Sequence, residues 1–213
     1  MRTYSHALQG AAAGLAVAML MGGCGLLEPK AERYVAPPLG TTWVTARQDT
    51  GSYGSGSGKV DGKRGERMYQ GAPAITFEAA GGTVVATQEG NWLGIFNGDT
   101  PVMTWDPPLH WQWPLEVGKS WARKQSMTVY PAKRTITYDV TQKVEAYEDV
   151  SVPAGTFKAF KVSTKTSLGD ENFVWYSPEH GLFVKQSLKR TANHAQGVGT
   201  REIELLTYTR AAP

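Results

Sequence analysis

The side chains best suited to acid–base or metal chemistry are widely separated in this sequence. It contains four histidines: His6, His110, His180 and His194. No two of them have the spacing of a metal-ligand pair. His194 belongs to a polar stretch of residues 193–196, and His180 follows Pro178 in a turn-forming segment. We therefore expect exposed loop histidines, with no metal site and no cofactor.

Acidic residues are the other candidates for chemistry. Paired carboxylates serve glycoside hydrolysis, and two groups of neighbours fit that pattern: Glu145, Glu148 and Asp149, and then Asp170 and Glu171. All of them lie at predicted strand ends or turns, where acidic residues are usually solvated. No serine lies in a Gly-x-Ser-x-Gly nucleophile elbow. We therefore expect a protein that is not an enzyme, and we keep a polysaccharide hydrolase as the alternative.

Tryptophan is abundant. The chain has seven tryptophans, and Trp105, Trp111 and Trp113 crowd one proline-rich segment. Large flat rings are common in sugar-stacking sites and in sites for apolar ligands. They also fill cores, and a β-domain without internal cysteines needs such bulk. We favour the core role and keep these three side chains as candidate ligand contacts.

The only cysteine, Cys24, ends an N-terminal segment that has the pattern of a secretion signal. Arg2 supplies a positive start, residues 7–21 are mostly apolar, and Gly22-Gly23 precedes the cysteine. An apolar run of about 15 residues is short for a membrane span, which needs roughly 20. The arrangement predicts a cleaved signal peptide over residues 1–23. The stretch from Leu20 to Cys24 resembles the lipobox of bacterial lipoproteins.

The lipobox resemblance implies a role for Cys24. In that family the cysteine thiol receives a diacylglyceryl group, the signal is cut before the cysteine, and the new amino terminus is acylated, for example with palmitate. Two or more acyl chains hold a protein on a membrane, whereas one chain binds only marginally. Gly25 stands where an aspartate commonly retains lipoproteins in the inner membrane. The resemblance therefore implies a lipid anchor on the periplasmic face of the outer membrane.

The rest of the chain divides into a tether and one domain. Residues 24–39 are expected to form a lipidated N-terminus and flexible tether, because Pro29, Pro37 and Pro38 oppose helix formation. Residues 40–213 are expected to form a single all-β domain, because apolar residues recur with period two. The clearest strand is 134–146, where the even positions are mostly apolar apart from Gln142 and the odd ones are polar. Such alternation is typical of an antiparallel sheet with one solvated face.

The predicted fold is a single antiparallel meander of about ten strands that forms a curved sheet, half-barrel, barrel or sandwich. Glycine, proline, asparagine and aspartate separate the strands at turns. Residues 104–114 are expected to be a long connection because prolines exclude a central strand, and residues 51–58 a mobile hairpin tip. The expected strands are Thr42–Gln48, Arg64–Tyr69, Ala74–Glu78, Thr83–Gln88, Asn91–Phe96, Ser120–Tyr130, Arg134–Ala146, Phe157–Thr166, Asn172–Tyr176, Leu182–Lys189 and Thr200–Thr209.

The second half of the chain resembles a known family. Residues 114–121, 144–157 and 175–185 carry short motifs in the order found in a widespread family of bacterial cell-envelope proteins, classed only as a domain of unknown function. The resemblance covers about residues 114–189. It implies a curved antiparallel sheet and offers no catalytic residues.

Charge excludes one class of partner. The formal net charge is +3 and the basic residues are scattered, which does not favour nucleic acid binding. We expect a non-enzymatic binding or assembly module, anchored to the membrane through lipid on Cys24, whose apolar, glycan or protein partner meets the concave side of the sheet. A hydrolase of envelope polysaccharide and a purely structural envelope component remain the alternatives.

Overall fold

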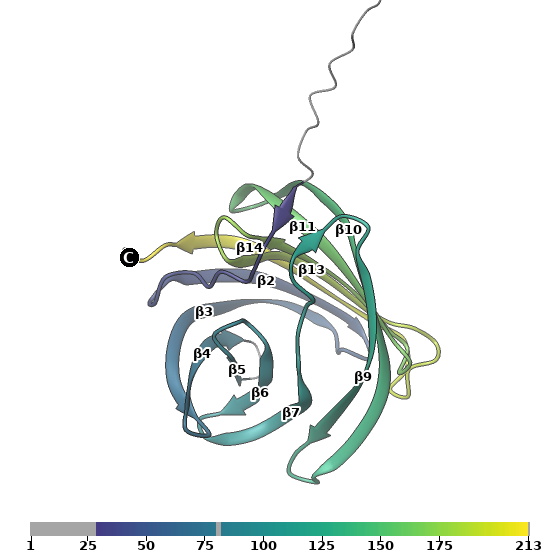
Figure 1. Cartoon of the computed structure of the whole chain (residues 1–213). Helices are drawn as coiled ribbons and strands as arrows, with labels where there is room; N and C mark the ends of the chain where they lie inside the picture. The colour runs from purple at the N-terminus through teal and green to yellow at the C-terminus, as the bar shows by residue number, and fades with distance from the viewer. Residues whose placement is uncertain (1–28, 80–81, 213) are drawn as a thin grey trace, which may run out of the picture.

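Period-two alternation becomes a rolled antiparallel sheet in the computed structural model (Figure 1). The structure describes residues 29–79 and 82–212, and these residues form strands and no helix. A short ladder joins β1 (Lys30–Ala31) and β8 (Leu115–Glu116). The other strands are β2 (Thr42–Gly51), β3 (Gly56–Tyr69), β4 (Ala72–Ala79), β5 (Gly82–Ala86), β6 (Trp92–Asn97), β7 (Thr100–Leu109), β9 (Ser120–Val129), β10 (Arg134–Val152), β11 (Gly155–Thr166), β12 (Asp170–Ser177), β13 (Leu182–Arg190) and β14 (Gly199–Thr209).

These twelve strands close into a barrel in the order β10-β11-β12-β13-β14-β2-β3-β4-β5-β6-β7-β9. Two ladders join strands that are not consecutive in the chain. The pairing of β14 with β2 runs from Thr209↔Thr42 to Gly199↔Gly51, and β9 pairs with both β7 and β10. The all-β antiparallel prediction is confirmed. The half-barrel, the sandwich and the count of about ten strands are wrong, because these two ladders leave the sheet without an open edge.

The alternation along strand β10 explains why one face of the sheet is buried. Tyr138, Val140, Gln142 and Val144 are buried, whereas the odd positions between them are exposed. Gln142 interrupts the apolar series without penalty, because its Oε1 accepts a hydrogen bond from Trp121 Nε1 at 3.0 Å and its Nε2 donates to Thr164 at 3.0 Å. A buried polar side chain is tolerated when it is hydrogen-bonded.

The longest strand that was not expected from the sequence is β7; the two-residue strands β1 and β8 were not expected either. Strand β7 covers much of the segment 104–114, which was predicted to be a connection, and pairs with β9 over Met103–Asp106. Pro107 and Pro108 fall just beyond that ladder, opposite an irregularity between Trp92 and Gly94 of β6. Proline is tolerated at such positions because no ladder hydrogen bond needs its missing N–H. Part of the segment therefore belongs to the sheet and is not a simple connection.

Residues 29–39, which we call the strap, pack against the barrel. β1 pairs with β8 through Lys30↔Glu116 and Ala31↔Leu115, and Ala31 and Pro37 are buried. The Tyr176 hydroxyl donates to Val35 O and accepts from Val35 N, each at 3.2 Å. The described part of the segment that was expected to be a flexible tether is thus bound by backbone and side-chain contacts.

Two glycines make the close approach of the strap possible. A Cβ at Gly90 would lie 2.5 Å from the Tyr34 ring, and a Cβ at Gly181 would lie 2.4 Å from Val35 O. Both glycines also have positive φ, 79° and 69°, which other residues adopt at a cost. Because Gly90 precedes β6 and Gly181 precedes β13, the strap touches two separate parts of the barrel.

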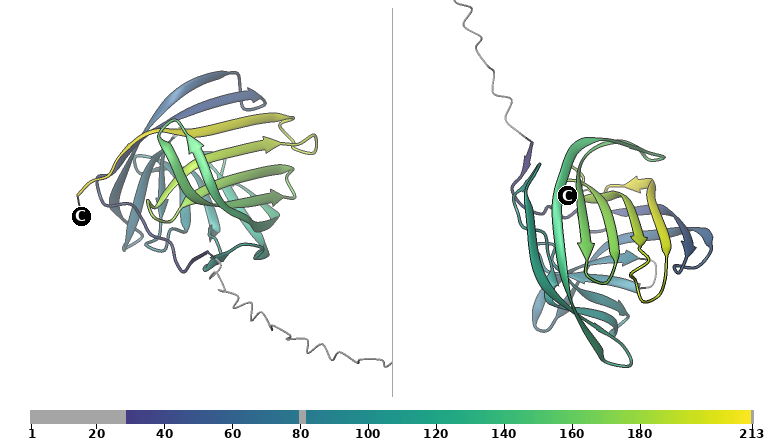
Figure 2. Two further views of the ribbon diagram at one scale, coloured as in Figure 1. Left: turned by 90° about the horizontal axis from the view of Figure 1, so that it is seen from above. Right: turned by 90° about the vertical axis from the view of Figure 1, so that its right-hand side faces the viewer.

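Apolar side chains pack on both faces of the sheet. Phe160 and Val162 of β11 belong to a cluster with Trp121, Val144 and Tyr176, whereas Phe157 and Ala159 of the same strand belong to a second cluster. The second cluster also holds Trp175, Leu182, Val184 and Leu205. The far ends of β10 and β11 arch over the sheet (Figure 2), and Ala154 N donates to Leu205 O at 3.1 Å. This arch covers the second cluster.

Candidate functional site

The barrel encloses a small cavity, of about 160 Å³, between β2–β6 on one side and β13–β14 on the other. Its apolar lining includes Trp43, Val60, Phe77, Val84, Trp92, Leu182, Phe183 and Ile203. Its polar lining includes Thr45, Arg47, Glu78, Lys185 and Gln186, and Tyr34 of the strap closes part of it. Strand pairing explains the convergence, because Arg47, Ile203 and Gln186 are consecutive partners across β2, β14 and β13 and so face the same side.

Aromatic rings gather beside one end of the cavity, and three of them, Tyr34, Trp92 and Phe183, line it. We call Tyr34, Trp92, Trp111, Trp113, Tyr176 and Phe183 the aromatic end. Their ring centroids are 5.7 Å apart for Trp111 and Phe183, 6.1 Å for Trp92 and Phe183, and 5.9 Å for Tyr34 and Tyr176. Such tilted and edge-on pairs are the favoured geometry for aromatic rings. Burial raises the pKa of Tyr34, and burial raises the pKa of Tyr176 to about 12, so both hydroxyls stay protonated at neutral pH.

A charged group lies farther along β13 and on the neighbouring strands β14 and β2, with the β2–β3 turn. We call Arg47, Asp49, Tyr53, Arg190 and Arg201 the arginine end. Asp49 is 8% exposed, and its carboxylate accepts two hydrogen bonds from Arg201, at 2.7 Å from Nε and 2.9 Å from Nη2. Arg47 Nε lies 3.3 Å from Asp49 Oδ2. Hydrogen bonding to Arg201 lowers the pKa of Asp49 and raises the pKa of Arg201.

Tyr53 and Arg190 complete the arginine end. The Arg190 guanidinium lies 3.9 Å from the centroid of the Tyr53 ring, and that of Arg201 lies 4.9 Å from it. Arg190 Nη1 donates to Ser52 O at 3.0 Å, whereas its buried Nε has no hydrogen-bond partner among the described residues. Stacking of guanidinium groups on an aromatic face stabilises charge that is partly removed from water. The β2–β3 turn thus holds two arginines against the barrel.

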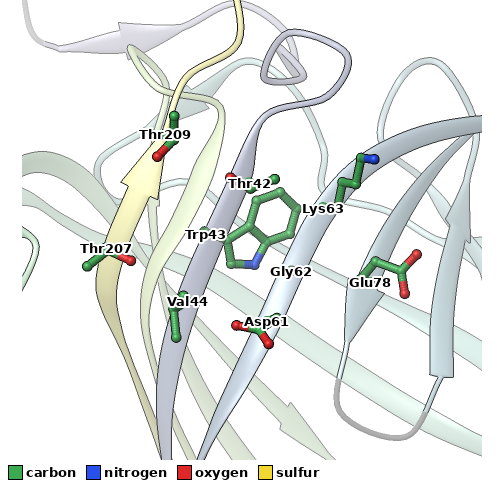
Figure 3. A pocket seen from close by; sticks show the side chains of 9 residues that line it. All are labelled: Thr42, Trp43, Val44, Asp61, Gly62, Lys63, Glu78, Thr207 and Thr209. Atoms are coloured by element: carbon green, nitrogen blue, oxygen red, sulfur yellow. The ribbon is translucent and has the colours of Figure 1, made fainter.

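A second, larger hollow lies outside the cavity, near the start of β2. It has a volume of about 500 Å³ and is lined by Trp43, Asp61, Lys63, Glu78 and several threonines (Figure 3). A Cβ at Gly62 would lie 2.0 Å from Trp43 Nε1, so the indole rests directly on the backbone of β3. Trp43 and Glu78 line both hollows and therefore lie at the boundary between them.

The tryptophans singled out from the sequence do not line the cavity. Trp111 and Trp113 pack against the cluster around Tyr176, with centroids 6.2 Å apart, and Trp105 lies 6.4 Å from Trp92. The cavity is lined by Trp43 and Trp92 instead. One available signal was the alternation of Trp43, Thr45 and Arg47 along the predicted strand Thr42–Gln48, which continues to Asp49 and places an indole and two charges on a single face.

The candidate acid–base residues are dispersed, and each has a local partner. Glu145 binds Lys143 and Ser163, each at 2.7 Å, Glu148 accepts from Trp175 Nε1 at 2.7 Å, and Asp149 pairs with Lys158 at 2.9 Å. Hydrogen bonding to Lys143 lowers the pKa of Glu145. Asp170 lies 3.5 Å from His194, and Glu171 lies 3.7 Å from Lys165. None of these carboxylates lines the cavity.

The other histidines are also dispersed. His110 Nδ1 lies 3.2 Å from Pro108 O, and His180 Nδ1 lies 3.0 Å from the Ser177 hydroxyl. Within residues 29–79 and 82–212, no group of three or more histidine, cysteine or acidic side chains is arranged to hold a metal ion. The described part of the chain also lacks a helix long and apolar enough to cross a membrane. Cys24 and the predicted signal peptide lie outside the described residues.

Comparisons with known proteins give distant structural likenesses. No family model matches the chain, and no curated protein matches it. A lipoprotein candidate from Parabacteroides distasonis aligns with a TM-score of 0.45 and 10% identity over 84% of this chain and 99% of its own. An exported-protein candidate from Bacteroides fragilis with a YmcC-like fold gives 0.46 and 14% over 84% and 100%. The hypothetical lipoprotein YmcC from Escherichia coli gives 0.43 and 12% over 82% and 85%. Likenesses at this level assign no family to the chain.

Proposed function

We propose that this protein is a non-enzymatic binding module of the cell envelope that holds the apolar part of a ligand inside its barrel. The observation that carries the proposal is the cavity between Trp43, Phe77, Trp92, Phe183 and Ile203. An apolar cavity of about 150 Å³ is large enough to bind a molecule of benzene size. The cavity of about 160 Å³ therefore suits a short apolar segment of a ligand.

The polar groups around the cavity suit orientation of a ligand. Binding sites are commonly apolar with a few convergent polar groups that fix orientation. Here Arg47 and Gln186 lie on the lining, toward the arginine end, while Tyr34 and Phe183 lie toward the aromatic end. A ligand with an apolar tail and a polar head fits this gradient better than a uniformly polar glycan does.

Anchoring to the outer membrane through lipid on Cys24 belongs to the same proposal. It rests on the apolar segment 7–21, on the glycines before the cysteine and on Gly25 after it. A Cys24→Ser variant should lose incorporation of a labelled fatty acid and should leave the membrane fraction. Label that persists in the variant would contradict the anchor and would leave the cavity proposal untouched.

A hydrolase is the rival candidate, and the placement of the carboxylates disfavours it. Two carboxyl groups must flank a scissile glycosidic bond at about 5 to 10 Å from each other. Glu148 and Asp149 are engaged with Trp175 and Lys158, away from the cavity lining. Loss of polysaccharide cleavage in a Glu148→Gln variant that stays folded would favour the rival.

The cavity is tested by filling it. Val60 lines the cavity from β3, whereas its neighbour Lys59 is exposed. We expect a Val60→Trp variant to abolish binding of 1-octanol, measured by titration calorimetry on the full chain carrying Cys24→Ser and purified without detergent. A Lys59→Trp variant, which adds the same bulk outside, should bind like the parent. Equal binding by both variants, or no binding by the parent, would overturn the proposal.

A further inference from the structure

Three arginines face the interior of the barrel at one end, with too little negative charge to balance them. Arg47, Asp49 and Arg201 lie on the same face of the sheet as Ile203, because strand neighbours two apart share a face. Arg190 shares that face through Gln186, four residues before it on β13. Asp49 is the carboxylate that pairs with both Arg47 and Arg201.

The remaining acidic groups offset only part of this charge: Glu78 lines the cavity from β4, together with the cationic Lys185 of β13. Asp170 faces Arg190 across the β12–β13 ladder, where it lies 3.5 Å from His194 Nε2. Glu202 and Glu204 lie on the opposite face, where they bind Ser187 and Lys185 at 2.6 and 2.7 Å. The Asp49 carboxylate is shared by the guanidinium groups of Arg47 and Arg201. The charge of Arg47, which lines the cavity, is therefore not fully compensated. Partly buried charge of this kind is stabilised by a counter-charge.

Arg47 is the member of this set that reaches the cavity. It lines the cavity together with Thr45, Gln186 and Ile203. Its side chain is 34% exposed, compared with 8% for Asp49, and its ionic contact among the described residues is the one at 3.3 Å to Asp49 through Nε. The bidentate pairing of Asp49 with Arg201 holds that carboxylate in place. Arg47 Nε lies within ion-pair distance of that carboxylate, and a guanidinium carries five N–H donors in all.

We propose that the ligand of the barrel is an anionic amphiphile, whose carboxylate or phosphate binds Arg47 while its apolar segment enters the cavity toward Phe183. This inference rests on the proposed binding function and names the chemical class of the ligand. Guanidinium recognises carboxylate and phosphate through paired, charge-assisted hydrogen bonds. Asp49 and Arg201 act as positioning residues, since they orient Arg47 and make no contact with the ligand themselves.

The test compares ligands that share a chain and differ in charge. Octanoate, 1-octanol and octylamine are titrated into the full chain carrying Cys24→Ser, without detergent, at low ionic strength. Hydrogen bonds to charged groups contribute about 1.5 to 3 kcal/mol, so octanoate should bind at least about tenfold more tightly than 1-octanol. Octylamine should bind most weakly. Octyl phosphate in place of octanoate then distinguishes a phosphate head from a carboxylate head.

Substitutions at Arg47 separate charge from shape. Arg47→Gln should reduce the preference for octanoate over 1-octanol to less than about threefold, while 1-octanol binding is retained. Arg47→Lys should restore part of the preference, because it keeps the positive charge without the planar fork. Lys59→Gln removes a positive charge from the exposed face of β3 and should leave the preference intact. The thermal midpoint of each variant confirms that it is folded.

The outcomes distinguish this inference from the function on which it rests. If the parent binds none of the three ligands, the binding function itself fails. If the parent binds octanoate and 1-octanol equally, the cavity binds ligands but the assignment of an anionic head is wrong. A preference for octanoate that survives Arg47→Gln also overturns the assignment, because the selectivity then comes from another group.

Discussion

The aromatic end and the arginine end of the barrel meet on β13, which carries Phe183 of the first and Arg190 of the second, and they are stabilised by different interactions. The aromatic end is closed by rings that pack against one another and by a strap that hydrogen-bonds to Tyr176. The arginine end is held by charge-assisted hydrogen bonds to Asp49 and by stacking on Tyr53. The cavity lies between the two ends. Its lining therefore includes both apolar side chains, such as Phe183, and the cationic side chain of Arg47.

The comparison indicates how the two ends respond to change. Packing of large rings is lost in proportion to the volume removed. A buried ion pair behaves differently, because removing one partner leaves the other charge uncompensated. The aromatic end should therefore determine most of the stability, and the arginine end should determine the response to pH and charge.

The largest effect is expected from Tyr176→Ala, which empties the centre of the aromatic end. Tyr176 is fully buried, with 0% exposure. Its loss should lower the free energy of unfolding by about 4 kcal/mol, measured by urea denaturation. Phe173→Ala, a substitution of a partly buried ring on the opposite face of β12, should cost less. An equal loss in the two variants would contradict the central role of the aromatic end.

Asp49→Ala should have the next largest effect, because it leaves Arg47 and Arg201 without their shared partner. We expect a loss of about 2 to 3 kcal/mol in the free energy of unfolding. The matched control is Asp149→Ala, which breaks an exposed pair with Lys158 whose two side chains are 60% and 53% exposed. Exposed pairs contribute less than about 1 kcal/mol. Similar losses in the two variants would show that the arginine end is not stabilised by its charge network.

Tyr176→Phe separates the hydroxyl from the ring and should have a smaller effect. It removes both hydrogen bonds to Val35 while it keeps the aromatic packing. We expect a loss of about 1 kcal/mol, together with faster cleavage of the strap by trypsin at Arg33. Unchanged cleavage would mean that the strap is held by β1 and the Tyr34 contacts alone.

The mildest change is acidification, which acts on the arginine end through Asp49. The pKa of Asp49 is lowered in the folded state, so the unfolded chain binds a proton at this site more readily than the folded chain does. Its contribution to stability is therefore present above the ordinary aspartate pKa of about 3.9 and is lost as the pH falls through the lower folded value. Urea titrations should show a steeper loss below about pH 4 in the parent than in an Asp49→Asn variant. Parallel curves would remove Asp49 from the acid response.

The sequence was sufficient for features that depend on neighbouring residues. The alternation along residues 134–146 predicted the buried face of β10, and turn residues located the boundaries of most strands. It was insufficient for features that depend on contacts between segments far apart in the chain. Arg201 and Asp49 are separated by 152 positions, and nothing local to either residue shows that β14 and β2 close the barrel. Residues 104–114 misled for a related reason, because their prolines are tolerated only where the ladder to β9 ends.

If Cys24 carries the proposed lipid, the short ladder between β1 and β8 would limit how far the barrel could stand from a membrane. Pairing begins at Lys30, so an anchor at Cys24 would leave only the few residues between them as slack. A fully extended chain covers at most about 3.5 Å per residue, which limits the reach to roughly 20 Å. The end of the molecule that carries the strap and the aromatic rings would then be held close to the bilayer, with the arginines directed away from it. A molecule that leaves the bilayer head first, with its apolar tail trailing, would already have the orientation that the cavity accepts.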